Sequence, residues 1–258
     1  MLILGVASVG VTTCVYLGDL WRRQEKTSSL PHWLYAGALA YWLVVFVIGA
    51  LHYNLCVGIK PWLITSAWTL GVVYLLVLRR FPIGALGSFI AALSTILTSF
   101  ALFGHPVERP MLGDSWHQSV LWIHIAMAFL GLTAFAFASS VSILYLIEAR
   151  MLKLKRHNTL RRRLPPLDTL DRLAFRSILA GFPLYTIALL LGSMRAFGQD
   201  AHVLKPAYVF AFVSWVIYGG VLQARLMAGW RGRRAAVLTL FGFVAAFIVV
   251  VSYSFGGG

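Results

Sequence analysis

Residues 116–147 read WHQSVLWIHIAMAFLGLTAFAFASSVSILYLI, a run without any acidic residue, lysine, arginine or proline. A helix of about 20 mostly apolar residues is enough to cross the hydrocarbon core of a bilayer. This run of 32 residues would be roughly 48 Å long as an α-helix. We therefore expect a membrane-spanning helix that projects beyond the bilayer or begins at its interface.

Seven further apolar runs flank this one. The first begins directly after Met1 without a basic stretch and lacks an obvious cleavage site, so we expect it to be retained as a span. The sequence predicts an all-α, polytopic integral membrane protein of about eight transmembrane helices, forming a single membrane domain over residues 1–258. The eight runs lie near residues 1–19, 33–52, 61–78, 83–103, 116–147, 174–194, 207–227 and 235–254.

The composition supports this fold class. Hydrophobic residues make up 60% of the chain and charged residues 12%, against roughly 45–50% and about 25% in ordinary globular domains. A soluble fold of this size has too few charges here to cover its surface. The sequence therefore predicts an integral membrane protein.

The positive charges are distributed asymmetrically along the chain. Of the 22 Lys and Arg residues, 18 lie in or beside the connections after the first, third, fifth and seventh runs. Because cytoplasmic loops carry the excess of Lys and Arg, this pattern predicts both termini outside, in a bacterial cytoplasmic (inner) membrane. The net charge of +14 is thus explained without a nucleic acid. The densest connection, residues 150–172, is a topology anchor or a site for anionic lipid or an acidic partner.

Histidines are the candidate functional residues. His124 lies inside an apolar run, where a neutral imidazole needs a hydrogen-bond partner or a metal. His52 ends its own run on the same predicted outer side, so two imidazoles at similar depth would suit a haem iron. The alternative is that His124 is a hydrogen-bonded packing residue. Arg195 and Lys205, also predicted outside, are candidates to pair with haem propionates or are ordinary interfacial cations.

Several chemistries lack support in the sequence. No carboxylate pair, Ser-His-Asp order, HExxH helix or Gly-rich phosphate loop is present, so we expect no enzyme and no ATP-driven activity. Cys14 and Cys56 form neither a CxxC pair nor a Cys-x-x-Cys-His motif, so no covalently attached haem is expected.

A family resemblance covers residues 111–255. The chain resembles the CcsA-like cytochrome c assembly proteins, and its layout is similar to their HemX/YpjD-type branch. The resemblance rests on Ser119-x-x-Trp122-Ile123-His124-Ile125, Ser142-x-x-x-Tyr145-Leu146-Ile147, Leu170-Asp171-x-Leu173-x-Phe175-Arg176-x-Ile178-x-x-Gly181-Phe182-Pro183-x-x-Thr186-Ile187 with Gly192, Trp215, Arg225 and Gly229-Trp230-Arg231-Gly232-Arg233-Arg234-Ala235.

What the resemblance implies is haem handling in cytochrome c biogenesis. His124 matches a family haem histidine, whereas Gln223 stands where the family has a histidine, so His52 or His202 would supply a second ligand. The leading hypothesis is a protein that binds haem b non-covalently at the outer face and presents it to cytochrome c maturation components.

Two alternatives remain at this stage. The first is a HemX-like regulator of tetrapyrrole synthesis that binds glutamyl-tRNA reductase through residues 150–172. The second, a small-molecule transporter, has less support because no repeat halves or paired broken helices are apparent.

Overall fold

The computed structural model describes residues 2–21, 30–53, 59–80, 84–103, 115–154, 164–198 and 206–255. The described part of the chain is all helical, as predicted, and a helix covers each of the eight apolar runs. These helices are α1 (Leu2–Trp21), α2 (Leu30–Tyr53), α3 (Ile59–Arg80), α4 (Gly84–Phe103), α5 (Ser115–Lys153), α7 (Leu167–Gly198), α8 (Pro206–Met227) and α9 (Arg233–Phe255).

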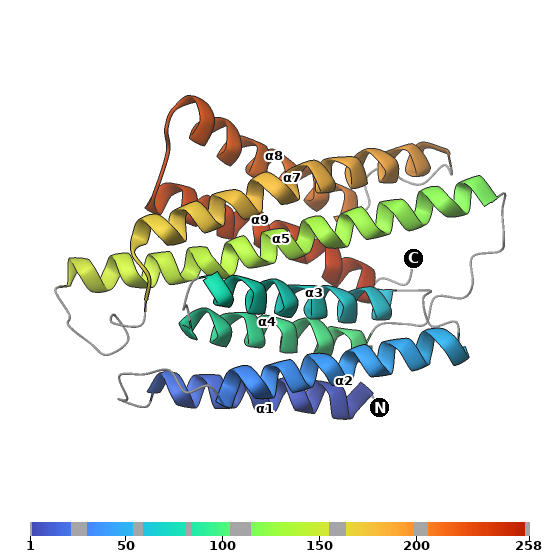
Figure 1. Ribbon diagram of the computed structural model, residues 1–258. Coiled ribbons are helices and arrows are strands. Elements are labelled where there is room, and N and C mark those ends of the chain that lie inside the picture. Colours follow the sequence, from blue (N-terminus) through green and yellow to red (C-terminus); the bar gives the residue numbers. More distant parts are fainter. Residues whose placement is uncertain are drawn as a thin grey trace.

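Within the described residues, 6 helices are long and apolar enough to cross a membrane, namely α3, α4, α5, α7, α8 and α9. This is the composition of a multi-pass membrane protein. Within the described side chains, the apolar stretches of α1 and α2 are shorter, Leu4–Gly18 and Leu30–Val45. The total of eight spans therefore stays a prediction, as does the orientation. The start of α1 and the end of α9 lie toward the same end of the bundle (Figure 1).

The long helices α5 and α7 run side by side through the molecule (Figure 1). The α5 helix has 39 residues, about 58 Å at the usual rise per residue, so its expected unusual length is confirmed. The two backbones approach closely at Gly131 and Gly181, because a Cβ atom on either glycine would lie 3.2 Å from the other's carbonyl oxygen. Small residues at such crossings let membrane helices pack backbone to backbone.

Three buried tyrosines join α1, α2, α3 and α4 near the ends of these helices. Tyr16 and Tyr74 place their hydroxyl groups 2.7 and 3.3 Å from Nδ1 of His32, which lies at the start of α2. The hydroxyl of Tyr35 lies 2.8 Å from Oγ of Ser94 on α4. All three tyrosine side chains are at most 1% exposed, so the polar atoms of this group hold the amino-terminal helices together from inside the bundle.

A second core cluster joins α5, α7 and α8. The rings of Phe135 and Tyr218 stack with their centroids 3.7 Å apart. Tyr185 of α7 places its hydroxyl group 2.8 Å from Oγ of Ser214 on α8. This cluster packs α7 and α8 against α5.

Candidate functional site

His124 lies on α5, at the interface with α7, and its side chain is half-buried. Its Nδ1 atom is 2.7 Å from the backbone oxygen of Ala188. Because a carbonyl oxygen can only accept, Nδ1 carries the proton and donates it in this hydrogen bond. In the neutral imidazole, Nε2 is then the nitrogen with the lone pair, which is the atom that a metal would take.

Gly192 makes room for the imidazole ring. A Cβ atom at this position would lie 2.8 Å from Cε1, 3.2 Å from Nδ1 and 3.6 Å from Nε2 of His124. The first of these distances is shorter than real Cβ contacts allow, so a side chain at position 192 would displace the ring. The ring of His124 thus rests directly on the backbone of α7, in a space that any residue other than glycine would fill.

The other predicted haem residues are described in part or not at all. His52 belongs to the last turn of α2, and Arg195 lies on α7 seven residues after Ala188. Seven residues are about two helical turns, so the backbone of Arg195 is on the same side of α7 as Ala188 and about 10 Å further along. His202 and Lys205 lie outside the described residues.

The structure brings His124 together with α7, whereas α2 belongs to another part of the bundle. The main neighbours of α2 are α1 and α3, and Figure 1 shows it on the side of the molecule away from α7 and α8. The pairing of His52 with His124 on one iron therefore stays a prediction without a described contact. In the described ranges, no group of three or more His, Cys, Asp and Glu side chains could hold a metal ion.

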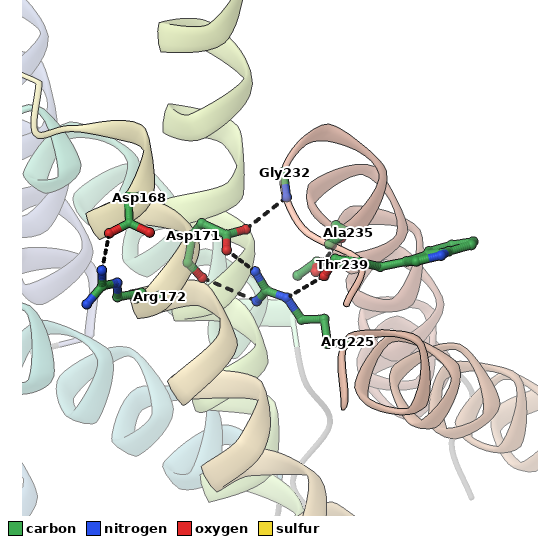
Figure 2. A network of polar contacts seen from close by, with 8 residues as sticks. Asp168, Asp171, Arg172, Arg225, Gly232, Ala235 and Thr239 are labelled. Carbon is green, nitrogen blue, oxygen red and sulfur yellow. Dashed lines mark hydrogen bonds and ion pairs between the residues drawn. The ribbon is translucent and has the colours of Figure 1, made fainter. Parts of the chain in front are cut away.

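A network of charges joins α7, α8 and α9 at the other end of these helices (Figure 2). Arg225 of α8 forms an ion pair with Asp171 of α7, and their side chains are 6% and 14% exposed. Arg225 also donates from NH1 to the Asp171 backbone oxygen (3.2 Å) and from Nε to the Trp230 oxygen (3.3 Å). Its guanidinium lies 4.8 Å above the ring of Phe175. Four contacts of three kinds thus hold the guanidinium of Arg225 in place.

The same network shapes the turn between α8 and α9. The Gly232 backbone N–H donates to Oδ1 of Asp171 (3.1 Å), which places a carboxylate at the positive end of α9. Gly229 and Gly232 have φ angles of 63° and 79°, a region that favours glycine. The turn therefore depends on both glycines and on the ion pair between Asp171 of α7 and Arg225 of α8.

Beside the pair is a small cavity, with room for about one water molecule, that is lined by Ser142, Tyr145, Asp171, Arg225 and Thr239 among others. The side chain of Ser142 is 1% exposed, and its Oγ has no hydrogen-bond partner within the protein. A buried hydroxyl group of this kind is usually satisfied by water. The cavity is therefore suited to one ordered water and is too small for an organic ligand.

Sequence reasoning missed this network and the contacts of His124. Asp171 and Arg225 appear in the family resemblance, yet nothing in their spacing of 54 residues shows that they pair. A signal was present, since each is a charged residue at the border of an apolar run, where burial requires a partner. Gly192 also appears in the family resemblance, but its lack of a side chain does not show which ring it makes room for, and Ala188 gives no signal because it contributes only its backbone.

Comparison with known proteins places these features in a family. The family described as "Cytochrome C assembly protein" matches residues 59–256, from α3 to α9. Among similar proteins, the "Cytochrome c biogenesis protein CcsA" of Prochlorococcus marinus (strain MIT 9301) is 28% identical over 221 residues, which cover 74% of this chain and 70% of the relative. The protein of the same description from Chlamydomonas reinhardtii is 29% identical over 193 residues, 69% of this chain and 52% of the relative.

A relative from another strain of Prochlorococcus marinus extends the similarity, at 27% identity over 266 residues that cover 89% of this chain and 81% of the relative. No solved structure matches the chain. The match of the family runs over the whole of α5, α7, α8 and α9, and so includes both His124 and the Asp171–Arg225 pair. The chain belongs to the cytochrome C assembly protein family.

Proposed function

We propose that this protein takes part in cytochrome c maturation by binding haem b without a covalent bond and presenting it to other maturation components. The observation that carries the proposal is the geometry of His124. Its Nδ1 proton is held by the Ala188 carbonyl, which leaves Nε2 as the ligating nitrogen. In histidines that ligate metals, the ring nitrogen that does not bind the metal usually donates its N–H to a carbonyl, a carboxylate or water. This hydrogen bond fixes the tautomer and raises the basicity of the ligating nitrogen.

The residues present fit haem as a ligand. The imidazole of His124 is half-buried between two apolar helices, and its Nδ1 donates to a backbone carbonyl, which is the donor chemistry of a haem-ligating histidine. Haem would supply the iron and the vinyl groups that later bond to cytochrome c. In our proposal this chain orients the cofactor and leaves bond formation to its partners, so it is not itself an enzyme.

His52 and His202 are the proposed alternatives for the second axial ligand. Arg195 and Lys205 are proposed to meet the propionates, and the position of Arg195 beyond Ala188 on α7 favours it over Lys205. The site is proposed to face outward from a bacterial cytoplasmic membrane. The described exposed cations support this orientation, because they cluster at the opposite end of the same helices.

A haem titration of the purified protein in detergent tests the proposal. The native protein is expected to give a Soret band that His124→Ala weakens strongly, while His157→Ala, from the basic connection, leaves it unchanged. His52→Ala and His202→Ala are compared next, and the second ligand is the one whose loss converts the six-coordinate spectrum to a five-coordinate one. Identical native and His124→Ala spectra would overturn the assignment.

The propionate contacts have a separate test. Arg195→Gln is expected to weaken the binding of haem and to leave the binding of haem dimethyl ester unchanged, because the ester carries no propionate charge. Lys205→Gln serves as the matched comparison. Equal losses with haem and its ester would show that Arg195 acts on the fold and not on the propionates.

A regulatory function is the second candidate, and the distribution of charge favours it. At the ends of α3, α5 and α8 and the first turns of α7 and α9, the described exposed charges are almost all positive, with Asp168 the exposed acid among them. The exposed cations are Arg79, Arg80, Arg150, Lys153, Arg172, Arg176, Arg231, Arg233 and Arg234. Such a surface suits an acidic partner, proposed as glutamyl-tRNA reductase, or anionic lipid.

Replacement of Arg161, Arg162 and Arg163 by Gln, in the connection outside the described residues, tests this second function. It predicts loss of co-purification with glutamyl-tRNA reductase and an unchanged haem spectrum. Unchanged recovery of the reductase, at high and low salt, would count against it.

A further inference from the structure

The position of the His124 ring is set by α7 and not by its own helix. The ring lies over the single turn from Ala188 to Gly192, where the carbonyl of the first residue accepts from Nδ1 and the second leaves open the space that a Cβ atom would take beside the ring. In a regular helix the same carbonyl also accepts from the N–H of Gly192, four residues on. The imidazole therefore shares one backbone acceptor with the residue that makes room for it.

The close approach of α5 and α7 makes this contact possible. His124 lies seven residues before Gly131 on α5, and Ala188 lies seven residues after Gly181 on α7. Because the two helices are neighbours in an antiparallel pair, equal steps in opposite directions end at the same level. A single alignment of α5 along α7 thus produces both the Gly131–Gly181 crossing and the His124–Ala188 hydrogen bond. The ring is held by backbone atoms, which cannot change rotamer.

We propose that Gly192 is a positioning residue for the axial ligand: the lack of a side chain there keeps Nδ1 of His124 on the Ala188 carbonyl and directs Nε2 toward the iron. The inference rests on the proposed haem function. A methyl group at position 192 would lie 2.8 Å from Cε1 of the ring, so the ring must turn or move. Either change disturbs the hydrogen bond to Ala188, whose Nδ1 donor would lie 3.2 Å from the same methyl group, and moves Nε2 with the ring.

In Gly192→Ala the ligand His124 is still present, but we expect its bond to the iron to be weaker. Loss of the outer partner of a metal-binding histidine typically costs 10–100-fold in affinity. Gly192→Ala is therefore expected to weaken haem binding by about one to two orders of magnitude, and to convert part of the low-spin spectrum to a high-spin one. Added imidazole is expected to restore the low-spin spectrum. It can take the place of the His124 ring on the iron, because the ring is displaced while the space for an axial ligand remains.

Gly220→Ala is the matched control. It makes the same substitution in the neighbouring helix α8, where a Cβ atom would meet nothing within 4 Å. It is expected to bind haem like the native protein, with the same spectrum and without a response to imidazole.

The comparison with His124→Ala separates the two levels of the proposal. If His124→Ala keeps the native spectrum, the proposed function itself fails. If His124→Ala loses the band while Gly192→Ala keeps native affinity and spin state, the haem site stands and the positioning role is overturned.

A stability measurement keeps the inference testable if Gly192→Ala accumulates poorly. The clash is with the His124 ring, so the destabilisation by Gly192→Ala should largely disappear in a His124→Ala background. The change in melting temperature of the haem-free single and double variants measures this coupling. Additive losses would show that the methyl group acts elsewhere, and would overturn the positioning role.

Discussion

Arg225 and Asp171 form a buried ion pair that links the carboxyl end of α8 to the amino end of α7, and through the Gly232 N–H to the start of α9. Removing one partner of such a pair leaves an uncompensated buried charge, which typically costs 3–5 kcal/mol. We expect Arg225→Met and Asp171→Leu each to lower the free energy of unfolding by about 3 kcal/mol. The double variant should lose less than the two single losses together.

The control for these single and double variants is a second ion pair, one helical turn away on α7. Asp168 and Arg172 form an exposed pair on α7 with side chains 56% and 68% exposed (Figure 2). Because solvent screens such pairs, Asp168→Ala should change the free energy of unfolding by about 0.5 kcal/mol or less. Thermal unfolding in one detergent measures the whole set. Equal losses at both pairs, or additive losses at the buried pair, would contradict the role given to Arg225.

Gly87 on α4 has a space at least as restricted as that of Gly192, in another part of the bundle. A Cβ atom there would overlap the hydroxyl oxygen of Tyr74 and lie 2.6 Å from Cε1 of Tyr16. Both rings are buried and hydrogen-bonded to His32, so neither can move without breaking that bond. We expect Gly87→Ala to destabilise the protein by about 1–3 kcal/mol, as overpacking does.

Gly37→Ala provides the comparison on α2, since its Cβ would meet nothing within 4 Å. In a helix, alanine without a clash is neutral or stabilising. The two variants are compared by thermal unfolding without haem. A Gly87→Ala protein as stable as Gly37→Ala would show that the tyrosine group is loosely packed.

The sequence predicted the helices well because a membrane span is a local property: about 20 apolar residues identify it wherever they occur. It also singled out His124, because an ionisable side chain in such a run is costly without a partner. The hydrogen-bond partner of His124 could not be predicted, since Ala188 is 64 residues away and contributes a backbone atom that every residue has. The Tyr16–His32–Tyr74 group was missed for a related reason: its members come from three helices, and which faces meet depends on packing that no run of sequence encodes.

The orientation of the chain has a direct test in the α1–α2 connection. Single cysteines are introduced at Ser28, Asn158 and Asp114 after Cys14 and Cys56 are replaced by serine, and intact cells are treated with a membrane-impermeant maleimide. The positive-inside pattern predicts labelling at position 114 and protection at positions 28 and 158. Permeabilised cells, in which all three react, provide the control.

Ser28 also tests the number of spans. If α1 and α2 both cross the membrane, their connection lies on the cytoplasmic side with residue 158. If neither crosses, the remaining six spans keep the same orientation, and position 28 moves to the outside and is labelled. Labelling at position 28 with protection at 158 would thus reduce the count from eight to six.

Haem binding at His124 should stabilise the fold, because a ligand that binds only the native state shifts the unfolding equilibrium. At a free haem concentration of about 100 times Kd the gain is about 2.7 kcal/mol, and it should appear as a higher melting temperature in the native protein and in Gly220→Ala. In Gly192→Ala at the same haem concentration the gain should fall to about 1.4 kcal/mol for a tenfold loss of affinity and to about 0.4 kcal/mol for a hundredfold loss. His124→Ala should show almost no shift. An equal shift in His124→Ala would mean that the haem stabilises the protein from the detergent phase or from another site, and that the bond between His124 and Ala188 serves packing alone.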